Sequence, residues 1–170
     1  KNLSFILRVL LKINFPLELS IYGPKLDLSY WKKCLNLINK LPSNINVIIK
    51  DEVSNNQVQK IFERHDLFVF PTLGENFGHV IFESLKSSTP VLVSDQTPWQ
   101  SNGEGGLQSL SLDESKWINT INVWSKFDDK ILFKKRKEAL KYILNYNNNS
   151  NALKQNKKFF NSILNNKSIV

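Results

Sequence analysis

The sequence predicts an α/β protein with a Rossmann-like, doubly wound parallel sheet, flanking helices and a helical C-terminal tail. The first observation behind this prediction is that short apolar segments of strand length alternate with amphipathic segments of helix length. The second is that only a few residues connect successive segments, which favours right-handed crossovers between parallel strands. The third is the segment Leu67-Phe68-Val69-Phe70, which is apolar throughout, as central strands covered on both faces are.

In the first half of the chain, apolar residues three and four positions apart predict helices, and alternating residues predict strands. Ser29 and Ser54 are expected to cap two of the helices, and Gly23-Pro24 to end the first strand. The elements expected here are a helix over 3–13, a strand over 17–22, a helix over 29–41, a strand over 45–49 and a helix over 54–64.

The second half continues this alternation, with Asp113 as the expected cap of its last helix. The elements expected here are a strand over 67–70, a helix over 77–87, a strand over 91–93, a short strand over 107–112 and a helix over 113–124. Loops that follow parallel strands open at the carboxyl edge of a sheet, where such folds bind ligands. We therefore expect the loops at 23–24, 50–51, 71–76 and 94–99 to meet at one edge.

The end of the chain has a different character. Two lysine-rich helical patterns, 127–146 and 152–164, are separated by a polar run at 147–151. We expect two parts: a Rossmann-like nucleotide-sugar-binding domain over 1–126, and a helical segment over 127–170 that packs on it or on an N-terminal domain outside this chain. The apolar residues available for such docking are Leu153, Phe159, Phe160, Ile163 and Leu164.

Composition restricts the class of protein. The 170 residues are 41% hydrophobic, enough for a buried core, and include no apolar run of the roughly 20 residues that a membrane span needs. The only cysteine, Cys34, excludes an internal disulfide and favours a reducing cytoplasm. The chain contains no Met, which suggests part of a longer protein.

The net charge is +8, with lysines clustered at 130–137 and 154–158. This charge fits a solvated helix face, and it also fits attraction to an anionic surface, such as the inner face of a membrane. Both interpretations stay open. We expect no nucleic-acid partner, because most aromatic residues fall within apolar strand or helix patterns and do not alternate with the basic residues.

The segment from Gly74 to Glu83 contains the candidate ligand-binding residues. It places two carboxylates, Glu75 and Glu83, eight positions apart around Gly78, and it leads from a strand into a helix. The first N–H groups of a helix lack intrahelical partners and carry partial positive charge, so they can bind a phosphate. A carboxylate within that helix can accept hydrogen bonds from nearby sugar hydroxyls. The combination suits a nucleotide diphosphate-sugar.

Residues 70–83, with the Glu75-x7-Glu83 spacing, and residues 89–95, Thr-Pro-Val-Leu-Val-Ser-Asp, resemble the nucleotide-sugar site of the family 4 (group 1) retaining glycosyltransferases. The resemblance implies the GT-B architecture and makes this chain its C-terminal, donor-binding half. It implies a hexosyltransferase that moves a sugar from a nucleotide diphosphate-sugar to a glycan or a lipid-linked acceptor. The isolated half is expected to be inactive, because the N-terminal domain supplies the acceptor.

The resemblance also implies roles for the acids and for a lysine. Glu83 is expected to bind the 2′- and 3′-hydroxyls of the ribose. Glu75, the candidate catalytic residue, is expected to contact the donor sugar and to stabilise positive charge at its anomeric carbon. Lys1, in a Lys-Asn context, matches one of two basic residues that neutralise the diphosphate. The other, an arginine at the end of the first strand, would precede this chain.

The remaining donor-binding residues surround the loop. Gly78 would let the backbone approach the diphosphate closely. The backbone amides of Gly78, His79 and Val80 would then donate to phosphate oxygens. The full set is Gly74, Asn76, Phe77, Gly78, His79 and Val80. Phe77 is expected to pack and anchor the turn, and His79 to act through its backbone and not as a general base.

No cofactor and no metal are expected. The sequence has no spaced acidic pair of the Mg²⁺-binding kind, and the adjacent pair Asp128-Asp129 lies on an expected helix far from the site. Two alternatives stay open: a sugar-nucleotide epimerase or phosphorylase of GT-B type, and a non-enzymatic basic binding module. Conversion of a nucleotide-sugar without an acceptor would indicate the first, and steep salt dependence of binding to DNA or liposomes the second.

Overall fold

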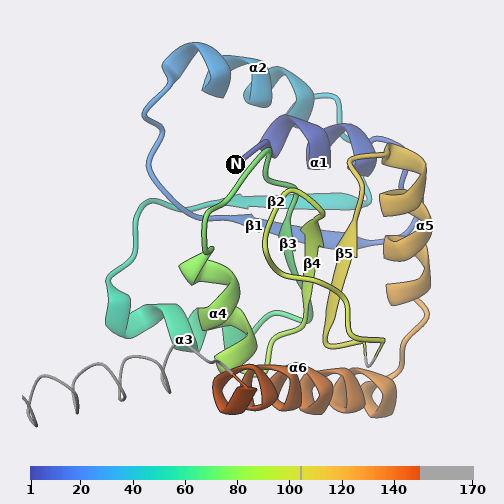
Figure 1. Cartoon of the computed structure of the whole chain (residues 1–170). Coiled ribbons are helices and arrows are strands. Elements are labelled where there is room, and N and C mark those ends of the chain that lie inside the picture. Colours follow the sequence, from blue (N-terminus) through green and yellow to red (C-terminus); the bar gives the residue numbers. More distant parts are fainter. Residues whose placement is uncertain (104, 150–170) are drawn as a thin grey trace, which may run out of the picture.

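The computed structural model describes residues 1–103 and 105–149. Its helices and strands alternate as expected for an α/β protein, and every strand pairing is parallel. The elements in chain order are α1 (Leu3–Leu10), β1 (Leu17–Ile21), α2 (Leu28–Ile38), β2 (Ile45–Ile49), α3 (Asn55–Glu63), β3 (Phe68–Phe70), α4 (His79–Lys86), β4 (Val91–Ser94), β5 (Leu107–Leu110), α5 (Glu114–Trp124) and α6 (Asp129–Asn149) (Figure 1).

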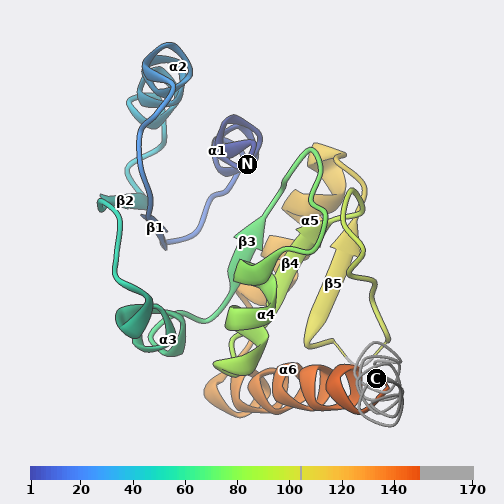
Figure 2. The ribbon, with the colours of Figure 1, turned by 60° about the vertical axis from the view of Figure 1, so that its left-hand side comes forward.

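The strands are divided between two parallel sheets. β1 pairs with β2, in a register that places Leu19 opposite Val47, whereas β3, β4 and β5 form the second sheet with β4 at its centre. Figure 2 shows the two sheets apart, with β1 and β3 on the sides that face each other. The predicted parallel α/β class is therefore confirmed, but among the described residues no strand pairing joins β1 to β3.

Two apolar clusters hold the layers together. In the first, Phe5, Val9 and Leu10 of α1 are buried with Ile45 of β2, Leu92 of β4 and Trp117 of α5, so side chains bridge the two sheets where backbone pairing does not. The Phe5 and Trp117 rings meet edge to face at 5.4 Å. The second cluster fills the space between the three-stranded sheet, α4 and α6.

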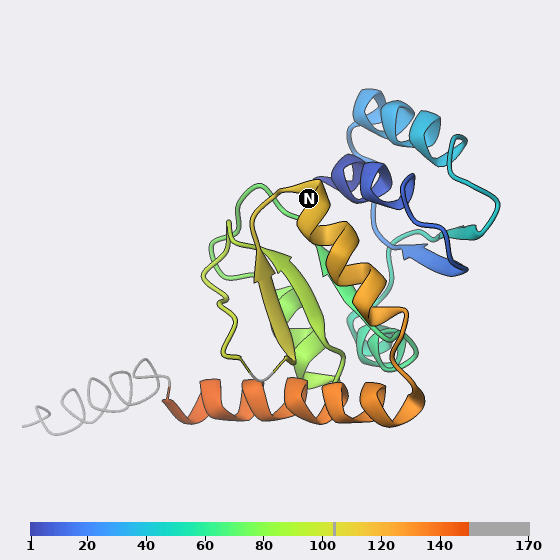
Figure 3. The ribbon, with the colours of Figure 1, turned by 90° about the vertical axis from the view of Figure 1, so that its right-hand side faces the viewer.

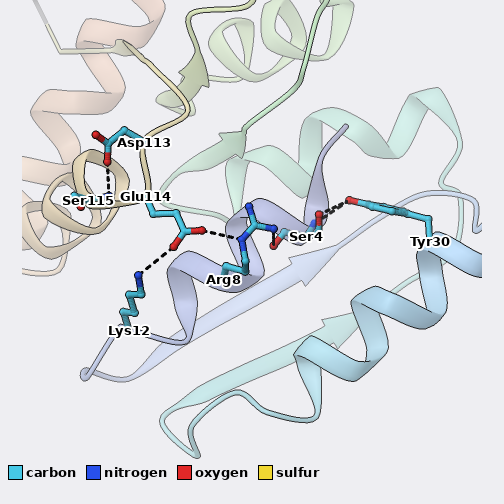
Figure 4. Close-up of polar contacts among 7 residues, drawn as sticks. All are labelled: Ser4, Arg8, Lys12, Tyr30, Asp113, Glu114 and Ser115. Carbon is cyan, nitrogen blue, oxygen red and sulfur yellow. Dashed lines mark hydrogen bonds and ion pairs between the residues drawn. The ribbon is translucent and has the colours of Figure 1, made fainter.

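Polar contacts fix α1 against α5 and α2. Nε of Arg8 lies 2.7 Å, and Nζ of Lys12 3.1 Å, from the carboxylate of Glu114 at the start of α5. The hydroxyl of Tyr30 in α2 accepts from the backbone N–H of Ser4 at 2.8 Å. Figure 4 shows these contacts on either side of α1. The Arg8 and Lys12 hydrogen bonds lower the pKa of Glu114 below its ordinary value.

α6 crosses the sheet at its amino edge. Figure 3 shows it running past the ends of the strands opposite to the loops that lead into α4 and α5. Ala139 and Ile143 are buried against the second cluster, and Tyr142 donates to the carbonyl of Gln100 at 2.8 Å. Gly106 permits this close contact, because a Cβ there would lie 2.3 Å from the backbone nitrogen of Ala139.

Some boundaries differ from the sequence-based expectation. Asp27, and not Ser29, caps α2, since its carboxylate accepts from the N–H of Tyr30 at 2.9 Å. Asp113 caps α5 as predicted, accepting from Ser115 at 2.8 Å. α6 continues to Asn149, through part of the run expected to be a linker. A long helix carries a few weak helix formers at its end with little cost.

Several expectations concern positions that lie outside the described residues. They are the second tail helix over 152–164 and its docking residues Leu153, Phe159, Phe160, Ile163 and Leu164. Within the described part of the chain, no helix has the length and apolar character needed to cross a membrane. Cys34 is buried, and this burial raises the pKa of its thiol.

Candidate functional site

The loop over 71–78 leaves the carboxyl end of β3 and returns to the start of α4. Thr72 is buried and shapes it: its hydroxyl donates to the carbonyl of Gly74 at 2.9 Å, and its own carbonyl accepts from the hydroxyl of Ser94 at 2.5 Å. The N–H of Glu75 donates to the carbonyl of Gln96 at 3.2 Å. The loops that follow β3 and β4 are therefore held side by side.

Gly78 occupies the turn into α4, and the geometry requires a glycine there. Its φ is +80°, in the left-handed region that L-residues rarely adopt. A Cβ at this position would lie 2.8 Å from Cδ1 of Ile81 and 3.2 Å from Cγ of Glu75. The backbone N–H groups of His79 and Val80 begin α4 and have no intrahelical acceptor, so they are available to an anion, whereas the N–H of Ile81 already donates to the carbonyl of Gly78 at 2.9 Å.

Glu75 and Lys1 are brought together although 74 positions separate them in sequence. They form an ion pair in which the lysine side chain is 65% exposed and the glutamate side chain 20% exposed. Nζ of Lys1 also lies 5.0 Å from the centroid of the Phe70 ring at the end of β3. Figure 1 shows the N-terminus beside the loop that follows β3 and leads into α4.

Glu83 lies one helical turn after His79, on the exposed side of α4. Its neighbours Ser84 and Leu85 are buried and face the core. The carboxylate of Glu83 has no hydrogen-bond or ion-pair partner among the described residues, and its backbone carbonyl accepts from Ser87. Glu75 lies in the loop before α4 and Glu83 lies within the helix, so the two acids occupy separate positions.

The other predicted residues fall into exposed and packed groups. Gly74, Asn76 and His79 are exposed, and Val80 is half-buried. Phe77 is half-buried, and its ring lies 4.8 Å from that of His79 and 5.6 Å from that of Trp99. Phe77 therefore packs inside the turn.

Sequence reasoning missed the role of Trp99. This residue is buried, its indole N–H donates to the carbonyl of Phe77, and its ring stacks on Tyr146 of α6 with 4.9 Å between centroids. It thus links the turn before Gly78 to α6. The available signal was an aromatic residue directly after Pro98 in a loop at the carboxyl edge.

The four loops expected at one edge form two pairs. Nζ of Lys25, after β1, lies 2.5 Å from the carboxylate of Asp51, after β2, and this contact lowers the pKa of Asp51. No hydrogen bond or ion pair of the described residues joins this pair of loops to the loops at 71–78 and 94–99. The two pairs of loops belong to different sheets, and among the described residues no strand is paired between β1 and β3.

The described residues contain no group of three or more His, Cys, Asp or Glu side chains placed to hold a metal ion. Asp128 serves a structural role, since its carboxylate accepts from the N–H of Ile131 at 2.8 Å at the start of α6. Lys1, beside the loop at 71–78, and the N–H groups at the start of α4 are features suited to an anionic ligand.

Comparison with known proteins identifies the family and the fold of this chain. Residues 1–101, more than half of the chain, match the family model described as glycosyl transferases group 1. No curated protein matches. The crystal structure of Anabaena Alr3699/HepE in complex with UDP-glucose is similar, with a TM-score of 0.72, 17% identity, and coverage of 84% of this chain and 40% of that chain.

A second structure of the same Anabaena protein, in complex with UDP and glucose, gives a TM-score of 0.71 at 16% identity over the same shares of both chains. The chain therefore spans about 40% of the length of these structures. At this level of identity the likeness establishes the fold, and it confirms the expected Rossmann-like half of a GT-B protein.

Proposed function

We propose that this chain, which belongs to the group 1 glycosyltransferase family, is the donor-binding part of a retaining hexosyltransferase. The whole enzyme transfers a sugar from a nucleotide diphosphate-sugar to a glycan or lipid-linked acceptor. The observation that carries this proposal is the convergence of Lys1, Glu75 and the Gly78 turn at the start of α4.

The diphosphate would bind at the start of α4. The amides of Gly78, His79 and Val80 donate to phosphate oxygens, and the partial positive charge of the helix terminus favours the anion. Lys1 neutralises part of the phosphate charge. Because its ammonium is mostly exposed and is already at this position, it can exchange Glu75 for phosphate without moving the backbone.

The two acids then act on different parts of the donor. Glu75, released from Lys1, lies beside the turn and stabilises positive charge that develops at the anomeric carbon. Glu83, whose carboxylate is exposed and unpaired within the described residues, accepts from two vicinal ribose hydroxyls. In a retaining transfer the diphosphate leaves from the face that the acceptor attacks and takes the acceptor's proton, so these residues need to supply no nucleophile.

We also propose that the active enzyme needs residues from before Lys1. The divided sheet supports this, because β1 and β3 each present an unpaired parallel edge toward the other, and one further parallel strand would unite the two sheets. An arginine at the end of that strand would join Lys1 at the diphosphate. A separate N-terminal domain would supply the acceptor, so residues 1–170 alone would bind nucleotide weakly and transfer nothing.

The direct test is calorimetric titration with UDP, GDP and ADP. Each charge-assisted hydrogen bond contributes about 1.5–3 kcal/mol, and exposure reduces this, so Glu83→Ala should weaken the preferred nucleotide roughly tenfold to a hundredfold. Glu63→Ala is the matched control, because Glu63 is an exposed acid near the end of the neighbouring helix α3. Equal heats for wild type and Glu83→Ala would reject the ribose role.

Two additions to this titration address the remaining elements of the proposal. EDTA should leave the affinity unchanged, since the proposal assigns neutralisation of the diphosphate to Lys1 and helix amides and expects no metal or cofactor. Incubation of a longer protein with nucleotide-sugar and no acceptor should leave the sugar unchanged, because conversion under these conditions would indicate an epimerase.

A further inference from the structure

We propose that the outer face of α6 docks on the surface of an anionic phospholipid bilayer. We define this outer face by the exposed residues along one side of the helix. They are Lys130, Phe133, Lys134, Lys137, Leu140, Lys141 and Leu144.

The outer face consists of two parallel strips. Phe133, Leu140 and Leu144 are seven and four positions apart, so they follow one line along the helix, and their exposed fractions are 59%, 38% and 53%. Lys130, Lys134, Lys137 and Lys141 are four, three and four positions apart, so they form a second line next to the first. From Lys130 to Leu144 the strips extend about 21 Å at 1.5 Å per residue.

The contacts across the two strips fit an interface between water and lipid. Nζ of Lys137 lies 4.4 Å from the centroid of the Phe133 ring, so an ammonium group is held beside an exposed aromatic side chain. In a helix lying on a bilayer, apolar side chains enter the boundary of the acyl chains while lysine stems reach up to the headgroups.

The exposed apolar side chains Phe133, Leu140 and Leu144 lie away from the buried side of α6. The opposite side of α6 makes the packing contacts, with Ala139 and Ile143 buried. Arg136 on the inner side donates to the carbonyl of His65 at 2.7 Å, and Lys135 lies 2.8 Å from the carboxylate of Glu138. On the outer face, Nζ of Lys134 lies farther from the same carboxylate, at 3.9 Å, and its side chain is 75% exposed. The exposed apolar strip is thus a feature that packing leaves unexplained, and exposed apolar surface beside like charges marks an interaction site.

The chemistry of the face favours lipid over nucleic acid. Proteins that bind single strands stack bases on several aromatic rings, whereas the outer face has one ring, which Lys137 approaches. Phosphate backbones are contacted by charged and polar groups, so nucleic-acid binding would leave the exposed Leu140 and Leu144 unused. A negatively charged headgroup layer above an apolar interior complements both strips at once, and the net charge of +8 adds to the attraction.

The location of α6 leaves the candidate donor site open. Figure 3 shows the helix at the opposite end of the three-stranded sheet from the loop that leads into α4. Docking through the outer face would therefore not cover the loop at 71–78. The inference is independent of the proposed catalytic function, since it concerns a surface that contains none of the donor-binding residues.

The test is vesicle flotation of the 170-residue chain. We expect binding to vesicles of equal parts phosphatidylcholine and phosphatidylglycerol, little binding to phosphatidylcholine alone, and weaker binding as salt rises. Joint replacement of Lys130, Lys134 and Lys137 by Gln should lower the partition coefficient about a hundredfold, since each lysine near an anionic surface contributes about a factor of five. Replacement of Phe133 and Leu144 by Ser should lower it at least tenfold.

The matched control replaces Lys32, Lys33 and Lys60 by Gln, which removes the same charge from exposed positions on α2 and α3. It should reduce partition less than threefold. Equal losses for the two triple variants would overturn the docking face in favour of general charge attraction. Tighter binding of a DNA duplex than of the vesicles, unaffected by the Phe133 and Leu144 changes, would overturn it in favour of nucleic acid.

Far-UV circular dichroism checks that each variant is folded, which is expected because every substituted side chain is exposed. If a multiple variant loses structure, single variants at Lys137 and Phe133 provide the same comparison. Each should lower the partition coefficient about fivefold. Wild-type partition in both single variants would refute the proposal.

Discussion

Substitution of Gly78 by Ala tests the turn on which the candidate site depends. Two costs are expected. The first is backbone strain at φ +80°, worth about 1–2 kcal/mol for an L-residue. The second is crowding, because the new Cβ would lie 2.8 Å from Cδ1 of Ile81, which is fully buried, and displacing a buried side chain from its rotamer costs about 0.5–1.5 kcal/mol.

Part of this cost is offset in the unfolded chain, which alanine makes less flexible by about 0.4–1 kcal/mol. The net loss of unfolding free energy should therefore be about 1–2.5 kcal/mol. We also expect UDP to bind at least tenfold more weakly, because the methyl group occupies the space through which a diphosphate would approach the amides of His79 and Val80. Urea denaturation gives the first quantity and calorimetric titration the second.

Two other glycines separate strain from crowding. Gly103 has φ +79° but nothing within 4 Å of a built Cβ, so Gly103→Ala carries the strain without the crowding. Gly74 lies in the same loop as Gly78, has no positive φ and has open space around it, so Gly74→Ala should be neutral or slightly stabilising. If Gly78→Ala unfolds at the same urea concentration as Gly103→Ala, crowding against Ile81 is refuted. If it binds UDP as wild type does, the close approach of the diphosphate is refuted.

Two further perturbations address the supports of the site. Trp99→Phe keeps an aromatic ring but removes the hydrogen bond to the carbonyl of Phe77 and part of the buried indole, so we expect a loss of about 1–3 kcal/mol and a few-fold weaker binding of UDP. An unchanged UDP titration would remove Trp99 from the site. Glu114→Gln should cost up to about 1 kcal/mol at pH 7, because two partly exposed ion pairs are lost. The folded-state pKa of Glu114 is lowered, so its stabilisation is complete above the unfolded-state pKa of about 4.3 and disappears as pH falls through the folded value. Urea curves of wild type and variant should therefore differ at pH 7 and converge toward pH 3, and a difference that grows on acidification would contradict this sign.

Local patterns predicted the order and type of the elements well. The helix near the start is expected from apolar residues at helical spacing, and Phe5, Val9 and Leu10 are indeed buried. Asp113 was identified as a cap because a short carboxylate before a helical pattern can accept from the exposed N–H groups. Such features depend on residues a few positions apart, so the sequence contains the information directly.

Boundaries and contacts between distant segments were less accessible. The pattern predicts Ser29 as the cap of α2, whereas Asp27, two positions earlier, caps it, because propensity alone does not separate two capping residues so close together. Trp99 was not assigned a role, because its partners Phe77 and Tyr146 come from a loop and from α6. No periodicity links these positions.

The sequence by itself determined an alternating α/β chain and a glycine turn before a helix that carries two acids eight positions apart, since spacing and residue type are local properties. Only the tertiary structure decided that Lys1 reaches Glu75, that the strands form two sheets, and that the lysines of α6 face outward beside Phe133 and Leu144. The physical reason is that these arrangements follow from packing between segments far apart in the chain, and a linear pattern does not encode which faces meet.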